Sequence, residues 1–142
     1  MAMFRETVSL SHDGATKALS AGMAPASARG VPQCFVVVDA SGETIASLRM
    51  DGARYLSMHT ARAKARTAAA INVATGAIPF EAAAAVASQG GVSCLPSGLP
   101  IRFDSRLAGA IGVGSGSGEQ DIDVARRPGR DRRGYAVSGS LR

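Results

Sequence analysis

The chain has 142 residues, of which 46% are hydrophobic and 19% are charged, a balance typical of one folded domain with its own core. No apolar run approaches the roughly 18 residues that cross a bilayer, and the N-terminus lacks the pattern of a secretory signal, so we expect no membrane partner. The only cysteines, Cys34 and Cys94, exclude a disulfide framework and favour the reducing cytoplasm.

The net charge of +5 lies entirely in the last 17 residues, where six arginines face one aspartate. The other 125 residues have ten basic and ten acidic side chains, so the folded part is neutral. Aromatic residues make up 4% of the chain and tryptophan is absent, which removes the stacking platforms of single-strand binders. We therefore expect no nucleic-acid partner.

The first half of the chain predicts one helix and one hairpin. Residues 8–29 are alanine-rich, with apolar side chains at helical spacing, and Pro25 should end or fray this helix. The β-branched run at 33–39, the turn at 40–43 and the alternating segment at 44–50 predict a β-hairpin.

The second half repeats this order of helix and hairpin. Asp51 is a candidate N-cap for a long helix over about 53–74, and a short helix is predicted at 80–88. Residues 96–100 are expected to form a loop, 101–103 and 107–113 a second hairpin, and a last helix should begin at Glu119. Because hairpins make antiparallel sheets, the fold class is α+β in a single domain.

Residues 126–142 break with this pattern, because arginines, proline and glycine interrupt the helix that residues 121–125 begin. We therefore divide the chain into a domain at 1–125 and a basic, poorly ordered tail at 126–142. The tail is either genuine or the product of a reading-frame change near codon 126. The abrupt stop within a helix favours the frame change.

The glycine-rich run at 109–118 fits neither a dinucleotide fingerprint nor a phosphate loop. A strand end followed by a tight turn explains the glycines better than an anion cradle does. The acids that follow, Glu119, Asp121 and Asp123, either favour the N-terminus of the next helix or hold a hard cation.

Several segments occur in an order and at spacings that resemble a known family. They are residues 36–43 (VVVDASGE), 48–53 (LRMDGA), 63–69 (AKARTAA), 98–101 (GLPI), 109–113 (GAIGV) and 119–121 (EQD). Residues 8–125 are in this way similar to the GlcG/HbpS family, a haem-binding or "haem-degrading" domain also found at the C-terminus of PduO-type proteins. The resemblance implies a profilin-like fold, an antiparallel sheet flanked by helices, that assembles into homo-oligomers, with haem as a possible cofactor.

Two groups of residues are candidates for a ligand site. Arg49 and Asp51 either fix the corner between strand and helix, or Arg49 binds a ligand carboxylate or haem propionate. On the long helix, Tyr55, His59, Arg62 and Arg66 follow i, i+4, i+7, i+11 spacing and share one face. This face suits an anionic aromatic or a porphyrin, but a solvated face or a subunit contact explains it equally well.

Within this set, His59 is the candidate iron ligand, and His59 or Tyr55 would move protons in an enzyme. Lys64 lies about 140° away around the helix and would bind ligand from a neighbouring subunit or reach the glycine turn; otherwise it is solvated. We expect the His59 face to open into a cavity shared with the Arg49 corner. The first hypothesis is a haem-binding homo-oligomer; the alternatives are a lyase or isomerase acting on an aromatic or hydroxy acid, and a subunit without a ligand.

Overall fold

The computed structural model describes residues 1–79 and 91–126, and the backbone of 135–137. The elements in chain order are α1 (His12–Ala28), β1 (Cys34–Asp39), β2 (Thr44–Arg49), α2 (Leu56–Ile71), the 3-10 helix η1 (Thr75–Ala77), β3 (Gly98–Phe103), β4 (Arg106–Gly114), α4 (Gly118–Arg126) and β5 (Tyr135–Val137). Both predicted hairpins form, β1 with β2 and β3 with β4. The short helix predicted at 80–88 falls outside the described residues.

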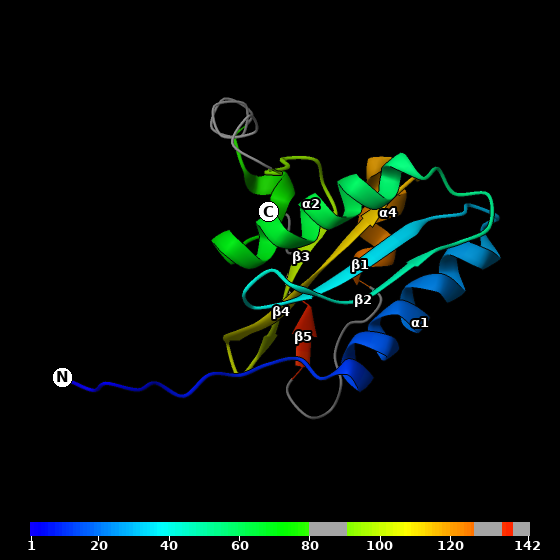
Figure 1. The fold of residues 1–142 in the computed structure, drawn as a ribbon. Helices are drawn as coiled ribbons and strands as arrows, with labels where there is room; N and C mark the ends of the chain where they lie inside the picture. The colour runs from blue at the N-terminus through cyan, green and yellow to red at the C-terminus, as the bar shows by residue number, and fades with distance from the viewer. Residues whose placement is uncertain (80–90, 127–134, 138–142) are drawn as a thin grey trace.

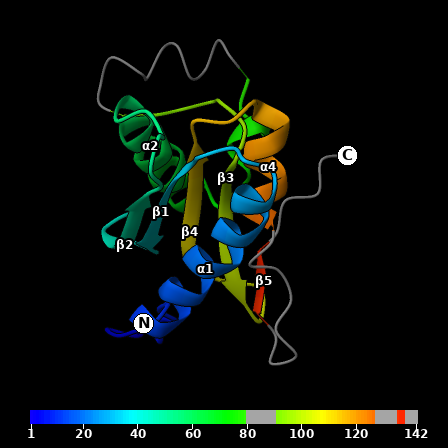
Figure 2. The same ribbon diagram turned by 90° about the vertical axis from the view of Figure 1, so that its right-hand side faces the viewer.

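The strands form one antiparallel sheet in the order β2-β1-β4-β3-β5. Helix α2 covers one face of this sheet, and α1 with α4 covers the other (Figures 1 and 2). The prediction of an α+β domain, with an antiparallel sheet flanked by helices, is confirmed.

The alternation of side chains along β1 divides the core between these two layers. Phe35 and Val37 pack with α1 and α4, whereas Val36 and Val38 pack under the alanines of α2. Both sets are buried, which is why β1 reads as a continuous apolar run rather than an alternating one.

Glycines in the sheet let the backbone of α2 approach closely. A Cβ at Gly112 would overlap the carbonyl oxygen of Ala61 and lie 2.7 Å from the amide nitrogen of Ala65. A Cβ at Gly98, the β3 partner of Gly112, would overlap the carbonyl oxygen of Lys64. The interpretation of the glycine run as a strand end and turn is confirmed, and packing against α2 explains why the strand itself needs glycine.

Two expected boundaries are wrong. Helix α1 continues beyond Pro25 to Ala28, because a proline in the last turn removes a single helical hydrogen bond and the Arg29 amide still bonds to the Pro25 carbonyl. Asp51 does not cap α2. That helix starts at Leu56 after the N-cap residue Tyr55, whose side chain makes no capping bond.

The expected loop at 96–100 is also wrong in part, because β3 already begins at Gly98 and contains Pro100. Among the described residues, β5 pairs only with Ile101, Arg102 and Phe103. The described residues therefore place no strand beside the outer side of β3 at Pro100, and such an edge position tolerates the missing amide of proline.

The boundary region near residue 126 is described only in part. Helix α4 ends at Arg126, and Tyr135–Val137 form β5 beside β3. The rest of the predicted tail, residues 127–134 and 138–142, lies outside the described residues. Within the described part of the chain, no helix is long and apolar enough to span a bilayer.

Candidate functional site

The corner between β2 and α2 is fixed by Arg49 without Asp51. The Arg49 guanidinium donates a hydrogen bond of 3.2 Å to the carbonyl oxygen of Ala53. The Asp51 side chain is exposed and forms no ion pair with Arg49. The amide of Arg54 then bonds to the Ser115 hydroxyl, which ties the connection to the end of β4.

The outer face of α2 has the predicted side chains in the predicted arrangement. His59, Arg62 and Arg66 are all exposed, as is Tyr55 with 69% of its surface accessible. None of the four side chains forms a hydrogen bond or ion pair with another described residue. Because α2 contains no acidic residue, its outer face presents an imidazole followed by two arginines, none of them paired with an acid of the described residues.

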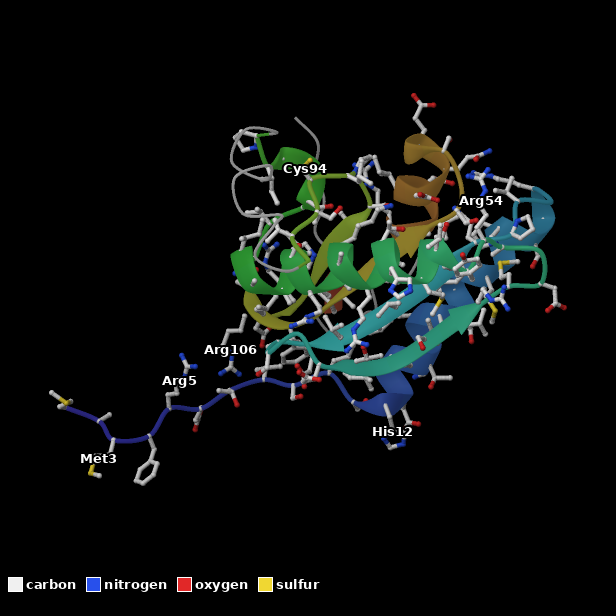
Figure 3. The ribbon with its side chains drawn as sticks, turned by 45° about the horizontal axis from the view of Figure 1, so that its top comes forward. Met3, Arg5, His12, Arg54, Cys94 and Arg106 are labelled. Atoms are coloured by element: carbon white, nitrogen blue, oxygen red, sulfur yellow. The ribbon has the colours of Figure 1, made fainter. Side chains whose placement is uncertain are left out.

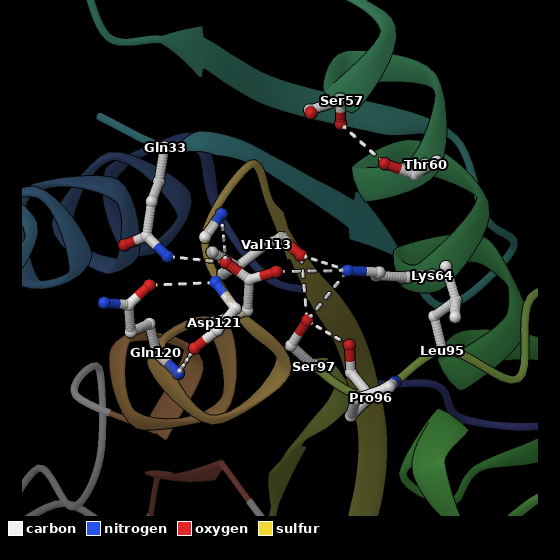
Figure 4. Close-up of polar contacts among 12 residues, drawn as sticks. Gln33, Ser57, Thr60, Lys64, Leu95, Pro96, Ser97, Val113, Gln120 and Asp121 are labelled. Atoms are coloured by element: carbon white, nitrogen blue, oxygen red, sulfur yellow. Dashed lines mark hydrogen bonds and ion pairs between the residues drawn. The ribbon is translucent and has the colours of Figure 1, made fainter. Parts of the chain in front are cut away.

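Lys64 points in the opposite direction, into the interior, and is only 4% exposed. Its ammonium donates to the carbonyl oxygen of Val113 at 2.7 Å and to the hydroxyl of Ser97 at 3.1 Å. It also forms an ion pair with Asp121 at 3.4 Å. Figure 4 shows the lysine extending from α2 past the end of β4 toward α4, so it joins helices on opposite faces of the sheet. Of the three expectations for Lys64 (a neighbouring subunit, the glycine turn or solvent), the structure shows the second, because Lys64 bonds to Val113 in the glycine-rich run at 109–118.

Asp121 is the centre of this buried network. One carboxylate oxygen pairs with Lys64, and the other accepts hydrogen bonds from the side chain of Gln33 at 2.6 Å and the amide of Gly116 at 2.9 Å. Asp121 and Gln33 are 3% and 0% exposed. The side-chain oxygen of Gln33, Oε1, is a buried acceptor without a donor among the described residues.

The network offers an acceptor to each proton of the Lys64 ammonium. Burial lowers the pKa of Lys64, while the charge and hydrogen bond of Asp121 oppose that shift. All three ammonium protons have acceptors, in Val113, Ser97 and Asp121. Such a group is a structural link between α2, the sheet and α4 rather than a general base or a nucleophile, both of which need a free lone pair.

Two hollows are formed by described residues. One, of about 20 Å³, is lined by Gly76, Pro96 and Ser97 with Arg126. The other, of about 180 Å³, lies between α2 and the β1–β2 turn and is lined in part by Arg66. Neither hollow is lined by Arg49, Tyr55, His59 or Arg62. The expected cavity shared by the His59 face and the Arg49 corner is therefore not provided by these hollows.

Sequence reasoning missed the pairing of Lys64 with Asp121. The signal was present, because an alanine-rich helix that packs on a glycine-rich strand must bury whatever stands at its inward positions. Lys64 lies between the inward residues Ala61 and Ala65, and a buried cation requires an acid. The alternative reading of the acids as a cation site finds no support, since the described residues contain no metal-binding group of three or more His, Cys, Asp or Glu side chains.

Comparison with known proteins agrees with this geometry. The model of the family described as "Haem degrading protein HbpS-like" matches residues 10–128. The corrinoid adenosyltransferase PduO of Salmonella typhimurium is 35% identical over 103 residues, 68% of this chain and 31% of that protein. PduO of Citrobacter freundii is 34% identical over 102 residues, 67% of this chain and 30% of that protein. The chain thus spans about a third of the length of these relatives.

Solved structures share the whole architecture. The Klebsiella pneumoniae protein ORFY superposes with a TM-score of 0.80 at 27% identity, covering 90% of this chain and 93% of its own. A complex of PduOC with haem gives 0.77 at 31% identity, with 85% and 93% covered. A double mutant of Streptomyces reticuli HbpS gives 0.76 at 30% identity, with 90% of each chain covered. The chain belongs to the HbpS-like family.

Proposed function

We propose that this protein binds haem on the outer face of α2, with His59 as the axial ligand of the iron. The exposed imidazole of His59 carries the proposal: it has no partner among the described residues, and it is followed on the same face by Arg62 and Arg66, which form no ion pair with a described residue. Support from relatives comes from the HbpS-like family match and from the structure of PduOC with haem, a protein of the same fold at 31% identity.

The chemistry of this donor set fits a haem. Imidazole is a common axial ligand of haem iron, and guanidinium groups are suited to carboxylates such as the two propionates. Tyr55 and Leu56 add apolar surface beside His59, being 69% and 60% exposed. A bound haem would supply an iron centre for ligand or electron exchange, while the protein binds and orients it.

The structure narrows the residues that can contact such a ligand. Lys64 is occupied by Asp121 inside the domain, and Arg49 is held by the Ala53 carbonyl. Neither is available without breaking an existing contact, whereas Arg62 and Arg66 form no hydrogen bond or ion pair with the described residues. The propionates are therefore assigned to the two arginines on the outer face.

We further propose that the protein works as a homo-oligomer in the cytoplasm. A haem on a convex helix is exposed on one side, and a second copy over the same face would cover its apolar surface. Leu56 and Tyr55 are large exposed apolar side chains on that face. The two cysteines are both free, as expected of a protein in a reducing compartment.

A titration of the protein with haem tests the binding site. Histidines occur only at positions 12 and 59, and both are exposed; His12 begins α1, on the other side of the sheet (Figures 1 and 3). We expect wild type and His12→Ala to develop the same shifted Soret band at micromolar haem, and His59→Ala to lose it. An unchanged haem spectrum with the wild type would show that the protein does not bind haem. A Soret band in His59→Ala identical to that of the wild type would show that His59 is not the iron ligand.

A further inference from the structure

A hollow lies between α2 and the β1–β2 turn, beside the outer face of α2. It measures about 180 Å³ and is lined by residues of the turn, of α2 and of the segment after it: Ala40, Ser41, Gly42, Arg66, Thr67, Ala70, Gly91 and Val92. It is below the size of pockets that enclose whole cofactors. Its volume suits one small group, such as a carboxylate on a flexible arm.

The polar groups around this hollow favour an anion. Arg66 runs along Gly42, where a Cβ would lie 3.7 Å from its Cγ and Nε atoms, and its guanidinium has no hydrogen bond or ion pair with any described residue. The nearest buried polar group, the Thr67 hydroxyl, already accepts from the Ser93 amide at 3.0 Å. The free cation is therefore the main polar group available to a ligand here.

The acids of the same turn do not neutralise Arg66. Asp39 is the first of them, and its carboxylate accepts hydrogen bonds from the amides of Ser41 at 2.8 Å and Glu43 at 3.1 Å. Glu43 is exposed, and neither acid forms an ion pair with Arg66. Within the described part of the chain, no acid therefore contacts the positive charge at the hollow.

The hollow stands at a defined distance from the candidate iron ligand. His59 and Arg66 are seven residues apart, so they differ by about 20° around α2 and by about 10.5 Å along it. This spacing is comparable with the reach from the centre of a porphyrin to its propionate carboxylates. A planar ligand lying along the outer face could place its metal at His59 and one carboxylate in the hollow.

We propose that the hollow at Arg66 is the carboxylate subsite of the ligand face, and that it sets the direction in which a haem lies along α2. The propionate edge points toward the C-terminal end of the helix, with one carboxylate on the Arg66 guanidinium and beside the Ser41 hydroxyl. This inference rests on haem binding at His59 and adds the residue that recognises the acid groups.

The test compares haem with haem dimethyl ester, whose propionates are uncharged, in one dilute-detergent buffer. The variants are Arg66→Gln and Arg5→Gln, which lose the same charge; Arg5 is exposed on the N-terminal segment away from α2 (Figure 3). We expect Arg66→Gln to weaken haem binding about tenfold or more at low salt, the value of one charge-assisted hydrogen bond. It should leave the affinity for the ester unchanged, and Arg5→Gln should alter neither.

The possible results distinguish a failure of the carboxylate subsite at Arg66 from a failure of haem binding itself. If wild type binds neither compound, haem binding itself fails. If wild type binds haem with a shifted Soret band but Arg66→Gln binds it equally well, the subsite is wrong while haem binding stands. An equal loss of affinity for haem and ester in Arg66→Gln would also overturn the subsite, because the defect would not depend on the carboxylates.

Discussion

Removing the charge of Asp121 should destabilise the domain far more than removing both charges of its ion pair. In Asp121→Asn, the ammonium of Lys64 stays 4% exposed and keeps only Ser97 and Val113 as full acceptors. Breaking a buried pair in this way costs about 3–5 kcal/mol. For a domain of this length, that predicts a fall in Tm of roughly 10–20 °C.

The other single variant and the double variant complete the comparison. Lys64→Met leaves Asp121 with hydrogen bonds from Gln33 and Gly116, so its cost is lower, about 2–3 kcal/mol. In the double variant no charge is buried, and we expect a loss of about 1–2 kcal/mol. The coupling energy between the two positions should then be at least about 3 kcal/mol.

Urea unfolding of the four proteins, followed by circular dichroism, measures these free energies. Near-equal slopes against urea are the control for an unchanged mode of unfolding. Costs that simply add between Lys64→Met and Asp121→Asn would refute the reasoning, since they would mean that the two groups do not interact in the folded state.

Three further predictions follow from the packing and burial. Gly112→Ala should lose about 3 kcal/mol of unfolding free energy, because its Cβ meets the backbone of α2. Gly76→Ala is the control and should lose little, because its Cβ would meet Pro96 at an ordinary 3.5 Å. Equal urea midpoints for the two variants would contradict this prediction. Burial lowers the pKa of Lys64 below 10.5, so between the lowered pKa and 10.5 the folded state binds fewer protons than the unfolded state. The unfolding free energy of the wild type should therefore rise with pH in this range, and it should rise less in Lys64→Met. Equal slopes of unfolding free energy against pH in the two proteins would argue against a lowered pKa. Burial also raises the pKa of the Cys34 thiol, so a thiol reagent should label Cys94 first and Cys34 only on unfolding. Simultaneous labelling of both cysteines in the native protein would contradict the burial of Cys34.

Elements whose residue pattern lies within one short stretch of sequence could be predicted. The run at 33–39 and the turn after it define the first hairpin, and β1 and β2 form there. The exposed row from Tyr55 to Arg66 followed from helical spacing alone, because i, i+4, i+7 and i+11 share one face whatever the helix packs on.

The contacts that depend on tertiary packing were not predictable in the same way. Lys64 reads as a surface residue until α2 is placed on the sheet, where Gly112 lets the helix backbone approach so closely that Lys64 is buried. Its acid partner Asp121 lies 57 positions later, and no local pattern links the two. Asp51 failed as a cap because α2 starts four residues after the turn that contains it.

The location of haem on the protein is tested most directly by histidine modification with diethyl pyrocarbonate, read at each position by mass spectrometry with and without haem. Both imidazoles are exposed in the single chain, so each reports independently. We expect haem to protect His59 and to leave the labelling of His12 unchanged. Protection of His12 alone, or undiminished labelling of His59 in the haem-loaded protein, would contradict a haem site on the outer face of α2.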